Sequence, residues 1–351
     1  MRVGLSLLTL VPGEVGGAET SARGLARGLA EVGTLDYVAF TPPAAPGAGE
    51  GLSETAVPEY RKARSIRERA FAMALAAARP QKLRRRFAGL DAVHYPLTIA
   101  LPTLDLPTAV TVHDLQHLDH PELFSRAERL FRARTHERSA RNADAVIVPS
   151  QFVRRRAIEL LGLPPERVHA IPWGVDHDRF RPGDGEREQF LLYPARPWPH
   201  KNHARLFDAF ALLRQERPEL RLVLTGGGHE GRAVPPGVEV RGLVPGDELA
   251  SLYRRTACLV FPSLYEGFGQ PPLEAMASGA PVAASNIPAI AEVAGEAAAL
   301  FEPEDPEDIA AVVSGVLDAP DRFAAAGPEQ ASRFTWAETA RRHETVYAGL
   351  T

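Results

Sequence analysis

Short apolar runs alternate with longer stretches of helical periodicity along this chain, and the alternation predicts parallel β-sheets covered by helices. Runs of about four to eight apolar residues suit buried parallel strands, whereas an apolar stripe with the period of a helix suits packing on a sheet. Because each run is followed by a helical stretch, the pattern is typical of βαβ units. In the first half of the chain, the expected strands are residues 3–10, 37–40, 92–95, 109–112, 145–148 and 168–171.

The alternation stops at residues 172–185, which are rich in Pro, Gly and Asp and which we interpret as a linker. We expect an α/β fold of two Rossmann-like, doubly wound domains, because a 351-residue chain is too long for one ordinary core. The expected boundaries are 1–175 for the first domain, 176–335 for the second and 336–351 for a C-terminal helix. The strands expected in the second domain are residues 190–193, 222–225, 238–241, 258–261, 282–284 and 298–301.

Composition excludes some classes of function. The formal net charge of -4 argues against a general nucleic-acid binder. The single cysteine, Cys258, lies in an apolar run, so we expect a buried strand residue, no intrachain disulfide and a cytoplasmic location. Residues 3–11 favour a first strand over a signal peptide, since no small-residue cleavage pattern follows them. No apolar segment approaches the ~20 residues of a membrane-spanning helix, so any membrane contact is expected to be peripheral.

The most informative tract is Glu266-Gly-Phe-Gly-Gln-Pro-Pro-Leu-Glu274, which predicts a Gly-rich turn and a helix that begins at residue 271 or 272. Backbone N–H groups of residues 267–270 then converge with a helix N-terminus, an arrangement that attracts phosphate. Carboxylates repel phosphate, so Glu266 and Glu274 are better explained as acceptors for hydroxyls at the two ends of a longer ligand. A sugar nucleotide has hydroxyls on both its sugar and its ribose.

This tract belongs to a longer one, Phe261 to Val282, that closely resembles the signature of glycosyltransferase family 4, retaining enzymes with the two-domain GT-B fold. Residues 111–115 and 193–203 resemble the subgroup of bacterial mannosyltransferases that assemble polysaccharides and O-antigens. The resemblance covers nearly the whole chain and is densest around residues 191–203 and 257–305. It implies an acceptor-binding and a nucleotide-sugar-binding domain that face a central cleft, with the last helix packed back on the first domain.

Two basic residues, Arg196 and Lys201, lie in the loop after the strand expected at 190–193. Fixed cations there would stabilise the charge that develops on a departing nucleoside diphosphate, as an alternative to a metal ion. The ordinary alternative is a solvated Arg and Lys in a loop. Because the broader family has Gly before the arginine and this chain has Ala195, Lys201 is the better supported of the two.

His113 and Asp114 end a strand, and Gly16 and Gly17 open the helix that follows the first strand. Each could be purely structural, as a core histidine or a strand-to-helix turn. The resemblance implies instead that His113 lies beside the donor sugar and that the glycine loop packs against the donor's phosphates and sugar. The remaining histidines lack a metal-ligand arrangement, so no metal site is predicted.

The expected donor site also includes residues that approach the nucleotide through their backbone. Gly226 follows a strand, and the segment that ends at Val244 resembles the one whose backbone meets the base edge, although either could be a simple tight loop. Glu274 is assigned to the ribose hydroxyls. The expected catalytic residues are His113, Glu266, Arg196 and Lys201. The expected donor-binding residues are Gly16, Gly17, Asp114, Gly226, Val244, Gly267, Phe268, Gly269, Gln270 and Glu274.

The chain is therefore expected to be a retaining, metal-independent hexosyltransferase in cell-surface polysaccharide or glycoconjugate synthesis. It would move a hexose, with GDP-mannose the favoured donor, to a glycan or lipid-linked acceptor, without a further cofactor and without nucleic acid as a partner. The acceptor hydroxyl would attack the face from which the diphosphate leaves, so no protein nucleophile is required. A nucleotide-sugar epimerase, a transferase for a small-molecule acceptor and a binding protein without activity remain alternatives.

Residues 61–86 contain ten Lys and Arg residues against one acid, Glu68, in a chain that is acidic overall. The ordinary interpretation is a solvated helical face. Apolar residues 71, 73, 75 and 83 beside the cations, together with the lipid-borne acceptors of the subgroup, favour peripheral contact with an anionic membrane. Residues 42–58, rich in Ala, Pro and Gly, are expected to form a mobile loop.

Overall fold

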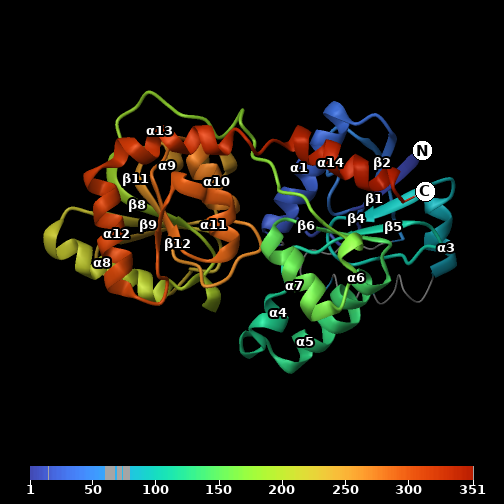
Figure 1. The fold of residues 1–351 in the computed structure, drawn as a ribbon, viewed down its shortest axis with the longest axis horizontal. Helices are drawn as coiled ribbons and strands as arrows, with labels where there is room; N and C mark the ends of the chain where they lie inside the picture. Colours follow the sequence, from blue (N-terminus) through green and yellow to red (C-terminus); the bar gives the residue numbers. More distant parts are fainter. Residues whose placement is uncertain (15, 60–67, 69–72, 74–79, 351) are drawn as a thin grey trace. The chain divides into compact units, whose positions relative to one another are not determined.

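The computed structural model describes residues 1–14, 16–59, 68, 73 and 80–350. The chain divides into two compact units, of which the first comprises residues 1–174 and 335–351 and the second comprises residues 175–334. Each unit has its own parallel sheet with helices on both faces (Figure 1). The expectation of an α/β, doubly wound fold with two sheets is therefore confirmed.

The described strands of the first unit form a seven-stranded parallel sheet in the order β3-β2-β1-β4-β5-β6-β7. β2 and β3 lie on one side of β1, and β4 to β7 lie on its other side. The strand order therefore reverses between β1 and β4. In open α/β sheets, ligands bind beyond the carboxyl ends of the strands at such a reversal. The strand bounds are β1 (Arg2–Ser6), β2 (Asp36–Thr41), β3 (Ser53–Ala56), β4 (Ala92–Tyr95), β5 (Thr108–Thr111), β6 (Ala145–Val148) and β7 (Val168–Ala170).

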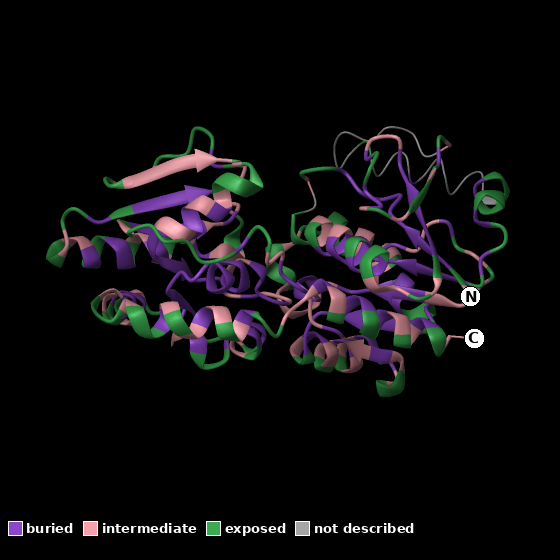
Figure 2. Cartoon of the chain, turned by 90° about the horizontal axis from the view of Figure 1, so that it is seen from above, coloured by how far each residue is buried: buried purple, intermediate pink, exposed green. Residues whose placement is uncertain are grey.

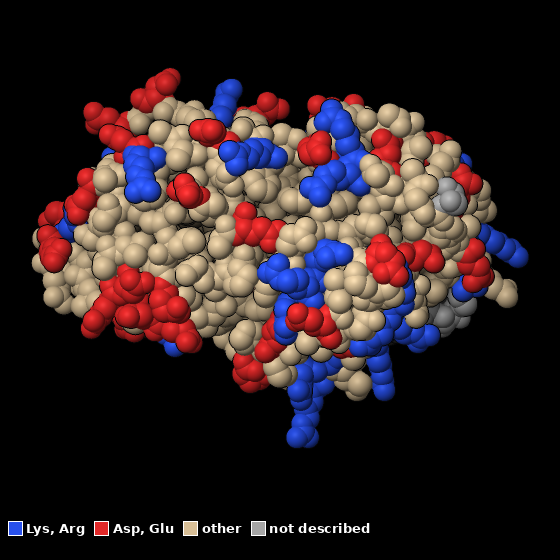
Figure 3. Space-filling model, in the orientation of Figure 1, with Lys and Arg blue, Asp and Glu red and all other residues tan. Residues whose placement is uncertain are grey.

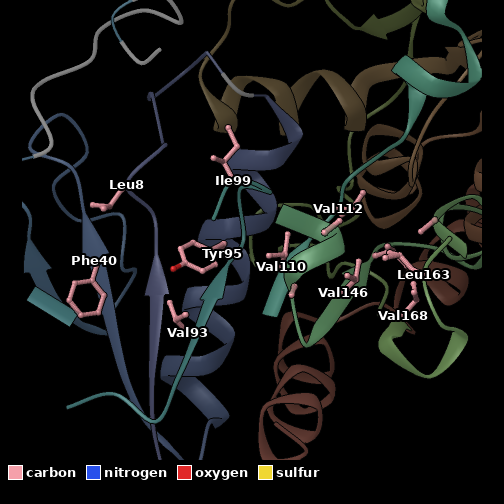
Figure 4. Packing of buried hydrophobic residues seen from close by; sticks show 14 of the residues in the cluster. Leu8, Phe40, Val93, Tyr95, Ile99, Val110, Val112, Val146, Leu163 and Val168 are labelled. Atoms are coloured by element: carbon pink, nitrogen blue, oxygen red, sulfur yellow. The ribbon is translucent and has the colours of Figure 1, made fainter. Parts of the chain in front are cut away.

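Neighbouring residues of a central strand fill two different cores because their side chains point to opposite faces of the sheet. Val110 and Val146 belong to the cluster that Figure 4 shows from close by, together with Val153 of α7. Ala109 and Ile147 belong instead to a cluster with residues of α1 and α14. The helices of this unit are α1 (Gly17–Val32), α3 (Pro80–Arg84), α4 (Gln116–Asp119), α5 (Arg126–Arg132), α6 (Arg138–Asn142), α7 (Gln151–Leu161) and α14 (Trp336–Ala348), with a π-helical turn η3 (Ala133–Glu137) between α5 and α6.

The last helix, α14, packs against α1, and glycines allow the approach. A Cβ atom on Gly24 would lie 2.2 Å from the Trp336 ring, and one on Gly28 would lie 2.4 Å from the Trp336 carbonyl oxygen. Tyr347 extends the contact, since its hydroxyl lies 2.7 Å from Nδ1 of the buried His94 in β4. The C-terminal helix is thus part of the first unit's core.

Two expectations for the first unit are wrong. β1 ends at Ser6 although the apolar run continues to residue 10, because the chain turns there and the Leu10 N–H donates to the Leu7 carbonyl oxygen at 3.0 Å. Residues 42–58, expected as a mobile loop, contain the edge strand β3, which pairs in parallel with β2. Its sequence, Ser-Glu-Thr-Ala, contains no apolar run, so tertiary pairing decides its conformation.

The second unit contains a parallel sheet of six described strands in the order β10-β9-β8-β11-β12-β13, which reverses between β8 and β11. Its strands are mostly buried, whereas the outer strand β10 is half-buried (Figure 2). The expected burial of Cys258 in a strand is confirmed. The strand bounds are β8 (Glu188–Pro194), β9 (Arg221–Thr225), β10 (Val238–Gly242), β11 (Thr256–Phe261), β12 (Val282–Ser285) and β13 (Ala299–Phe301).

Helices of the second unit pack in two groups on the two faces of its sheet: α8 contacts α12, and α10 contacts both α9 and α13. None of the helices in the described part of the chain is long and apolar enough to cross a membrane. The helix bounds are α8 (His203–Glu216), α9 (Gly246–Arg255), α10 (Gln270–Ala277), α11 (Pro288–Ala294), α12 (Pro306–Asp318) and α13 (Pro320–Ala331), with a short 3-10 turn η5 (Pro199–Lys201) before α8.

Candidate functional site

In the second unit, the two strands that flank the sheet reversal each lead into a loop with candidate residues. β8 leads through Arg196 to Lys201, and β11 leads through Pro262 to Glu266. Lys201 Nζ donates to Glu266 Oε1 at 2.5 Å, and both side chains are largely buried, with 13% and 15% of their surface exposed. The structure therefore brings together two residues that are 65 positions apart in the sequence and that were both expected to act on the donor.

Backbone hydrogen bonds hold the Lys201 loop against the Glu266 loop. The Leu264 N–H donates to the His200 carbonyl oxygen at 2.8 Å, and the Tyr193 hydroxyl donates to the Lys201 carbonyl oxygen at 2.7 Å. Tyr193 is fully buried in β8, so its ring provides a rigid base for the loop. Hydrogen bonds to the backbone of the two loops thus position the ion pair.

Asn202, which the sequence did not single out, joins the two loops. Its backbone has φ 59° and ψ 36°, a left-handed conformation that Asn tolerates better than most residues. Its side-chain Nδ2 donates to the carbonyl oxygens of Pro262, at 3.0 Å, and Pro303, at 2.7 Å. An Asn directly after a candidate lysine, at the point where a loop enters a helix, is the sequence signal that could have identified it.

Arg196 lies in the same loop as Lys201 and is half-buried. Its guanidinium carbon lies 5.8 Å from the centre of the Trp198 ring, within the range of a cation–π contact. Trp198 itself is 47% exposed. The structure thus places the Arg196 charge beside an exposed aromatic ring.

The Gly-rich turn adopts a geometry close to the expected one. α10 begins at Gln270, one residue before the expected range, and Pro271 and Pro272 occupy its first turn. Gly269 precedes the helix with φ 121°, and a Cβ atom there would lie 2.7 Å from Ile290 Cδ1. The positive φ favours glycine at this position, whereas the Ile290 side chain could shift to admit a Cβ atom. The turn, which has no side chains at 267 and 269, ends at the N-terminus of α10. Backbone N–H groups at a helix N-terminus favour the binding of an anion.

Phe268 is a candidate whose side chain the structure assigns to the protein core. It is 2% exposed, and its ring lies edge-on to Phe334 with 6.1 Å between centroids. Only its backbone is left to approach a donor, which agrees with the expectation that residues 267–270 contribute backbone N–H groups. The two glycines beside it retain the role of exposing the backbone.

Glu274 lies in α10 with 8% of its surface exposed, and the Tyr253 hydroxyl donates to its Oε2 atom at 3.0 Å. Burial raises the pKa of Glu274 to about 7, and the hydrogen bonds from Tyr253 and Gln270 and the charge of Arg179 oppose the rise. Tyr253 is fully buried in α9. No sequence pattern pointed to this tyrosine, because its importance depends on the packing of α9 against α10.

Gly226 and Val244 differ in how much surface their segments leave open to a ligand. Gly226 has φ 110°, and a Cβ atom there would lie 3.0 to 3.2 Å from backbone atoms of Ala195 and Arg196, so packing of two loops already explains this glycine. Val244 is half-buried after β10, beside Leu243, which is 72% exposed. Of the two segments, the one around Val244 leaves more surface open to a ligand.

In the first unit, Gly16 and Gly17 lie where β1 leads into α1. Gly16 caps the helix with φ 54°, and no heavy atom lies within 4 Å of a Cβ atom built on it. A Cβ atom on Gly17 would lie 3.8 Å from the Trp173 ring. The glycine at position 16 is therefore needed for its backbone conformation, and the space beside it is open.

His113 and Asp114 follow β5 and are oriented by polar contacts. His113 Nε2 lies 2.9 Å from the Pro96 carbonyl oxygen, so Nε2 carries the proton and Nδ1 can accept a hydrogen bond. Nδ1 is buried without a partner among the described residues. Burial lowers the pKa of His113 and keeps the ring neutral.

The carboxylate of Asp114 is held in its charged form. Burial would raise its pKa, but the guanidinium of Arg132, whose nearest nitrogen lies 3.8 Å from Oδ1, and the Gln116 N–H outweigh burial and lower it. Asp114 thus presents a fixed negative charge next to a neutral histidine. Such a pair can accept hydrogen bonds from sugar hydroxyls but would repel phosphate.

No group of three or more His, Cys, Asp or Glu residues within the described ranges could hold a metal ion. In the basic stretch, residues 61–67, 69–72 and 74–79 lie outside the described residues. Met73 and Leu83 are buried in the core of the first unit, so the expectation that they offer apolar contacts to a membrane is wrong. Two cations of the stretch lie near Oε1 of Glu59: a guanidinium nitrogen of Arg86 at 2.9 Å and Nζ of Lys82 at 3.9 Å.

Comparisons with known proteins agree with the fold. The sequence profile described as Glycosyltransferase Family 4 matches residues 15–179, and the profile described as Glycosyl transferases group 1 matches residues 188–319. The structure of HepE from Anabaena, in complex with UDP and glucose, superposes with a TM-score of 0.75 at 18% identity and covers 99% of this chain and 100% of that one. At this identity the likeness shows the fold alone.

Two relatives show closer sequence similarity. The MMP alpha-(1->4)-mannosyltransferase of Mycolicibacterium hassiacum is 33% identical over 227 residues, which cover 60% of this chain and 55% of that protein. The O-antigen chain mannosyltransferase B of Escherichia coli is 28% identical over 272 residues, which cover 70% and 71% of the two chains. The matched region thus spans little more than half of the first relative.

The fold and the comparisons together define a protein of GT-B architecture. The two profile matches fall one in each unit and together span most of the chain. The chain belongs to glycosyltransferase family 4.

Proposed function

We propose that this protein is a retaining, metal-independent mannosyltransferase that uses a nucleotide-diphosphate sugar, with GDP-mannose the favoured donor, and a glycan or lipid-linked acceptor. The observation that carries the proposal is the Lys201–Glu266 pair, which lies at the sheet reversal of the second unit with Nζ and Oε1 2.5 Å apart. A cation and a carboxylate at this place match the two parts of such a donor, a diphosphate and a polyhydroxylated sugar. The names of the two relatives support mannose, and the UDP and glucose of HepE support a nucleotide-sugar donor in general.

Each candidate residue then has a chemical task. Lys201 and Arg196 offset the charge that grows on the diphosphate as the glycosidic bond breaks, which stabilises the transition state more than the bound donor. The turn at 267–270 donates backbone N–H groups to phosphate oxygens. Glu266 accepts hydrogen bonds from sugar hydroxyls, and Glu274 accepts them from the ribose diol.

The first unit supplies groups for neutral hydroxyls. Nδ1 of His113 accepts a hydrogen bond from a hydroxyl of the sugar or acceptor, while Asp114 helps to orient it. The acceptor oxygen forms its bond to the anomeric carbon on the face from which the diphosphate leaves. Because the new bond forms on the face of the broken one, the anomeric configuration is retained, and the leaving phosphate oxygen takes the acceptor's proton, so no protein nucleophile is needed.

The test is to incubate the protein with a panel of nucleotide sugars, with and without glycan and lipid-linked acceptors, in the presence and absence of EDTA. We expect nucleoside diphosphate release that requires both GDP-mannose and an acceptor, that survives EDTA, and that yields the donor's anomeric configuration by NMR. Release of inverted product, or a strict requirement for a divalent ion, contradicts the proposed mechanism. Consumption of donor without an acceptor would favour the epimerase alternative.

A further inference from the structure

One helical segment of the first unit has a face that its core does not use. α5, η3 and α6 run without interruption from residue 126 to residue 142, and no residue of α5 is buried. Leu130 in α5 is 50% exposed, and Leu123 just before the helix is 36% exposed. Exposed single leucines are common, so the charges around them decide whether this face has a role.

Acidic residues near this face are committed to local partners. Glu122 lies 3.1 Å from Nδ1 of His120, and Glu128 completes a capping box with Ser125. Glu137 is buried and lies 3.0 Å from Arg141. None of the three glutamates of residues 120–141 therefore neutralises the outer side of the helix.

Basic residues dominate the outer side. Residues 120–141 contain six arginines against three glutamates, in a chain with a net charge of -4. Four of the arginines are exposed and form no ion pair with any residue that the structure describes. These exposed residues are Arg126, Arg129, Arg134 and Arg138, and together with Leu123 and Leu130 they define what we call the α5 surface. Figure 3 shows basic side chains projecting where α5 lies in Figure 1.

Positions 126, 130, 134 and 138 recur every four residues and therefore lie on one side of the helix. The π-helical turn at 133–137 adds a residue to one turn, which offsets the drift of a four-residue repeat around an ordinary α-helix. Leu130 thus lies between Arg126 and Arg134 on one side of the helix. Positive charge and apolar surface therefore lie on the same side.

We propose that the α5 surface docks on an anionic lipid bilayer, with arginines at the headgroups and Leu123 and Leu130 at the boundary with the acyl chains. Basic residues at an anionic leaflet and apolar residues inserted between them are the two contributions that hold an interfacial helix. A soluble anionic glycan would match the arginines but would leave the two leucines without a partner. The surface differs from residues 61–86, whose described apolar side chains at 73 and 83 are buried.

The position of α5 gives the docking a function. Arg132, on the inner side of the same helix, lies 3.8 Å from Asp114, one of the residues proposed to act on hydroxyl groups. A bilayer on the outer side of α5 would present lipid-borne acceptors next to that residue. The proposed docking is separate from the proposed transfer reaction. Vesicle binding is measured without a donor, so it can fail or succeed independently of transfer activity.

The experiment measures co-sedimentation of the full chain with phosphatidylglycerol-containing vesicles and with pure phosphatidylcholine vesicles, at low and high salt. We expect binding to anionic vesicles that salt weakens and little binding to neutral ones. The variant R126S/R129S/R134S/R138S should lose about fivefold in binding per arginine removed, or more than a hundredfold in total. L130E should lose roughly tenfold. Arg132 is left unchanged because it contacts Asp114.

Matched controls separate this surface from net charge and from folding. R181S/R232S/R322S/R333S removes four exposed arginines of the second unit, and L212E alters a leucine of α8 that is 36% exposed. Both should bind anionic vesicles much like the native chain. All variants should retain native circular dichroism and transfer to a soluble acceptor, because no altered side chain is buried. Their activity tests the proposed function separately.

Four outcomes would overturn the proposal. One is a native chain that ignores anionic vesicles at low salt. Another is an equal loss of binding for the α5 variant and the second-unit variant, which would leave net charge as the cause. The third is that R84S/R85S/R86S abolishes binding to anionic vesicles while the α5 variant keeps it. The fourth is a soluble polyanion that displaces the chain from vesicles and whose own binding L130E does not change.

Discussion

Lys201 Nζ and Glu266 Oε1 lie 2.5 Å apart, although one residue follows β8 and the other follows β11. Each side chain satisfies the other, so neither charge is buried alone. In the proposed reaction, the diphosphate of the donor adds negative charge beside Lys201 and competes with Glu266 for it. The ion pair fixes the position of the lysine that we propose stabilises this charge as the glycosidic bond breaks.

We predict that Lys201→Ala lowers kcat by about a hundredfold, ~3 kcal/mol, while the donor Kd changes much less, by analogy with the removal of an oxyanion donor. Steady-state kinetics and donor titration by calorimetry, both with EDTA present, measure the two effects. A variant that loses donor affinity and keeps kcat would show that Lys201 stabilises the ground state instead.

Asn202 should act as a positioning residue through its two side-chain hydrogen bonds to Pro262 and Pro303. Asn202→Gly keeps the left-handed backbone available and removes these bonds together with the one that Oδ1 accepts from Arg205 at 3.2 Å. Asn202→Ala adds backbone strain. We predict that Asn202→Gly costs about 1–3 kcal/mol of stability because two carbonyl groups lose partners. We also expect kcat to fall more than donor affinity.

Denaturant unfolding and kinetics on the same samples test this prediction. Asn202→Ala should be less stable than Asn202→Gly. Unchanged kcat in a destabilised Asn202→Gly variant would mean that the residue supports only the fold and does not position Lys201.

For Glu274, we predict pH-dependent donor binding. Its pKa is about 7, raised by burial, so the carboxylate that accepts ribose hydrogen bonds becomes populated only as the pH rises through 7. Donor affinity should therefore increase from pH 6 to pH 8 and then level off. Tyr253→Phe removes a hydrogen bond that favours the charged form, so the midpoint should move to higher pH.

Glu274→Gln should abolish that pH dependence and weaken nucleotide-sugar binding by about 1.5–3 kcal/mol, the value of a hydrogen bond to a charged group. A ribose-free sugar phosphate lacks the diol, so its affinity should change less. Calorimetric titration of both ligands across the pH range measures these effects. Equal losses for the two ligands would remove the ribose assignment.

The sequence predicted the sheets because alternating burial follows from local patterns, and it predicted the Gly-rich turn because glycine and proline constrain the backbone directly. It missed β3, where pairing with β2 acts on the polar sequence Ser-Glu-Thr-Ala. It also missed Tyr253 and Asn202, whose roles arise from contacts with distant residues. The sequence also did not predict that the Phe268 side chain, inside a candidate motif, points into the core.

The contact between α1 and α14 leads to a prediction about stability. Gly24→Ala places a Cβ atom 2.2 Å from the buried Trp336 ring, so the helices must separate. Overpacking costs typically ~1–3 kcal/mol, which exceeds the gain of less than about 1 kcal/mol from the better helix propensity of Ala. The matched change is Gly315→Ala in α12, where the glycine is exposed and no heavy atom lies within 4 Å of the new Cβ. That variant should gain roughly 0.4–1 kcal/mol in the free energy of unfolding.

Tryptophan fluorescence during denaturant unfolding can separate the two changes, because Trp173 and Trp336 lie in the first unit and Trp198 lies in the second. Single-tryptophan backgrounds would assign each transition to one unit. We expect Gly24→Ala to lower the midpoint reported by Trp336 and Gly315→Ala to leave it unchanged. If Gly24→Ala were as harmless as Gly315→Ala, α14 could not be packed against α1 in solution. The rest of the first unit would then be folded without α14 packed on its sheet.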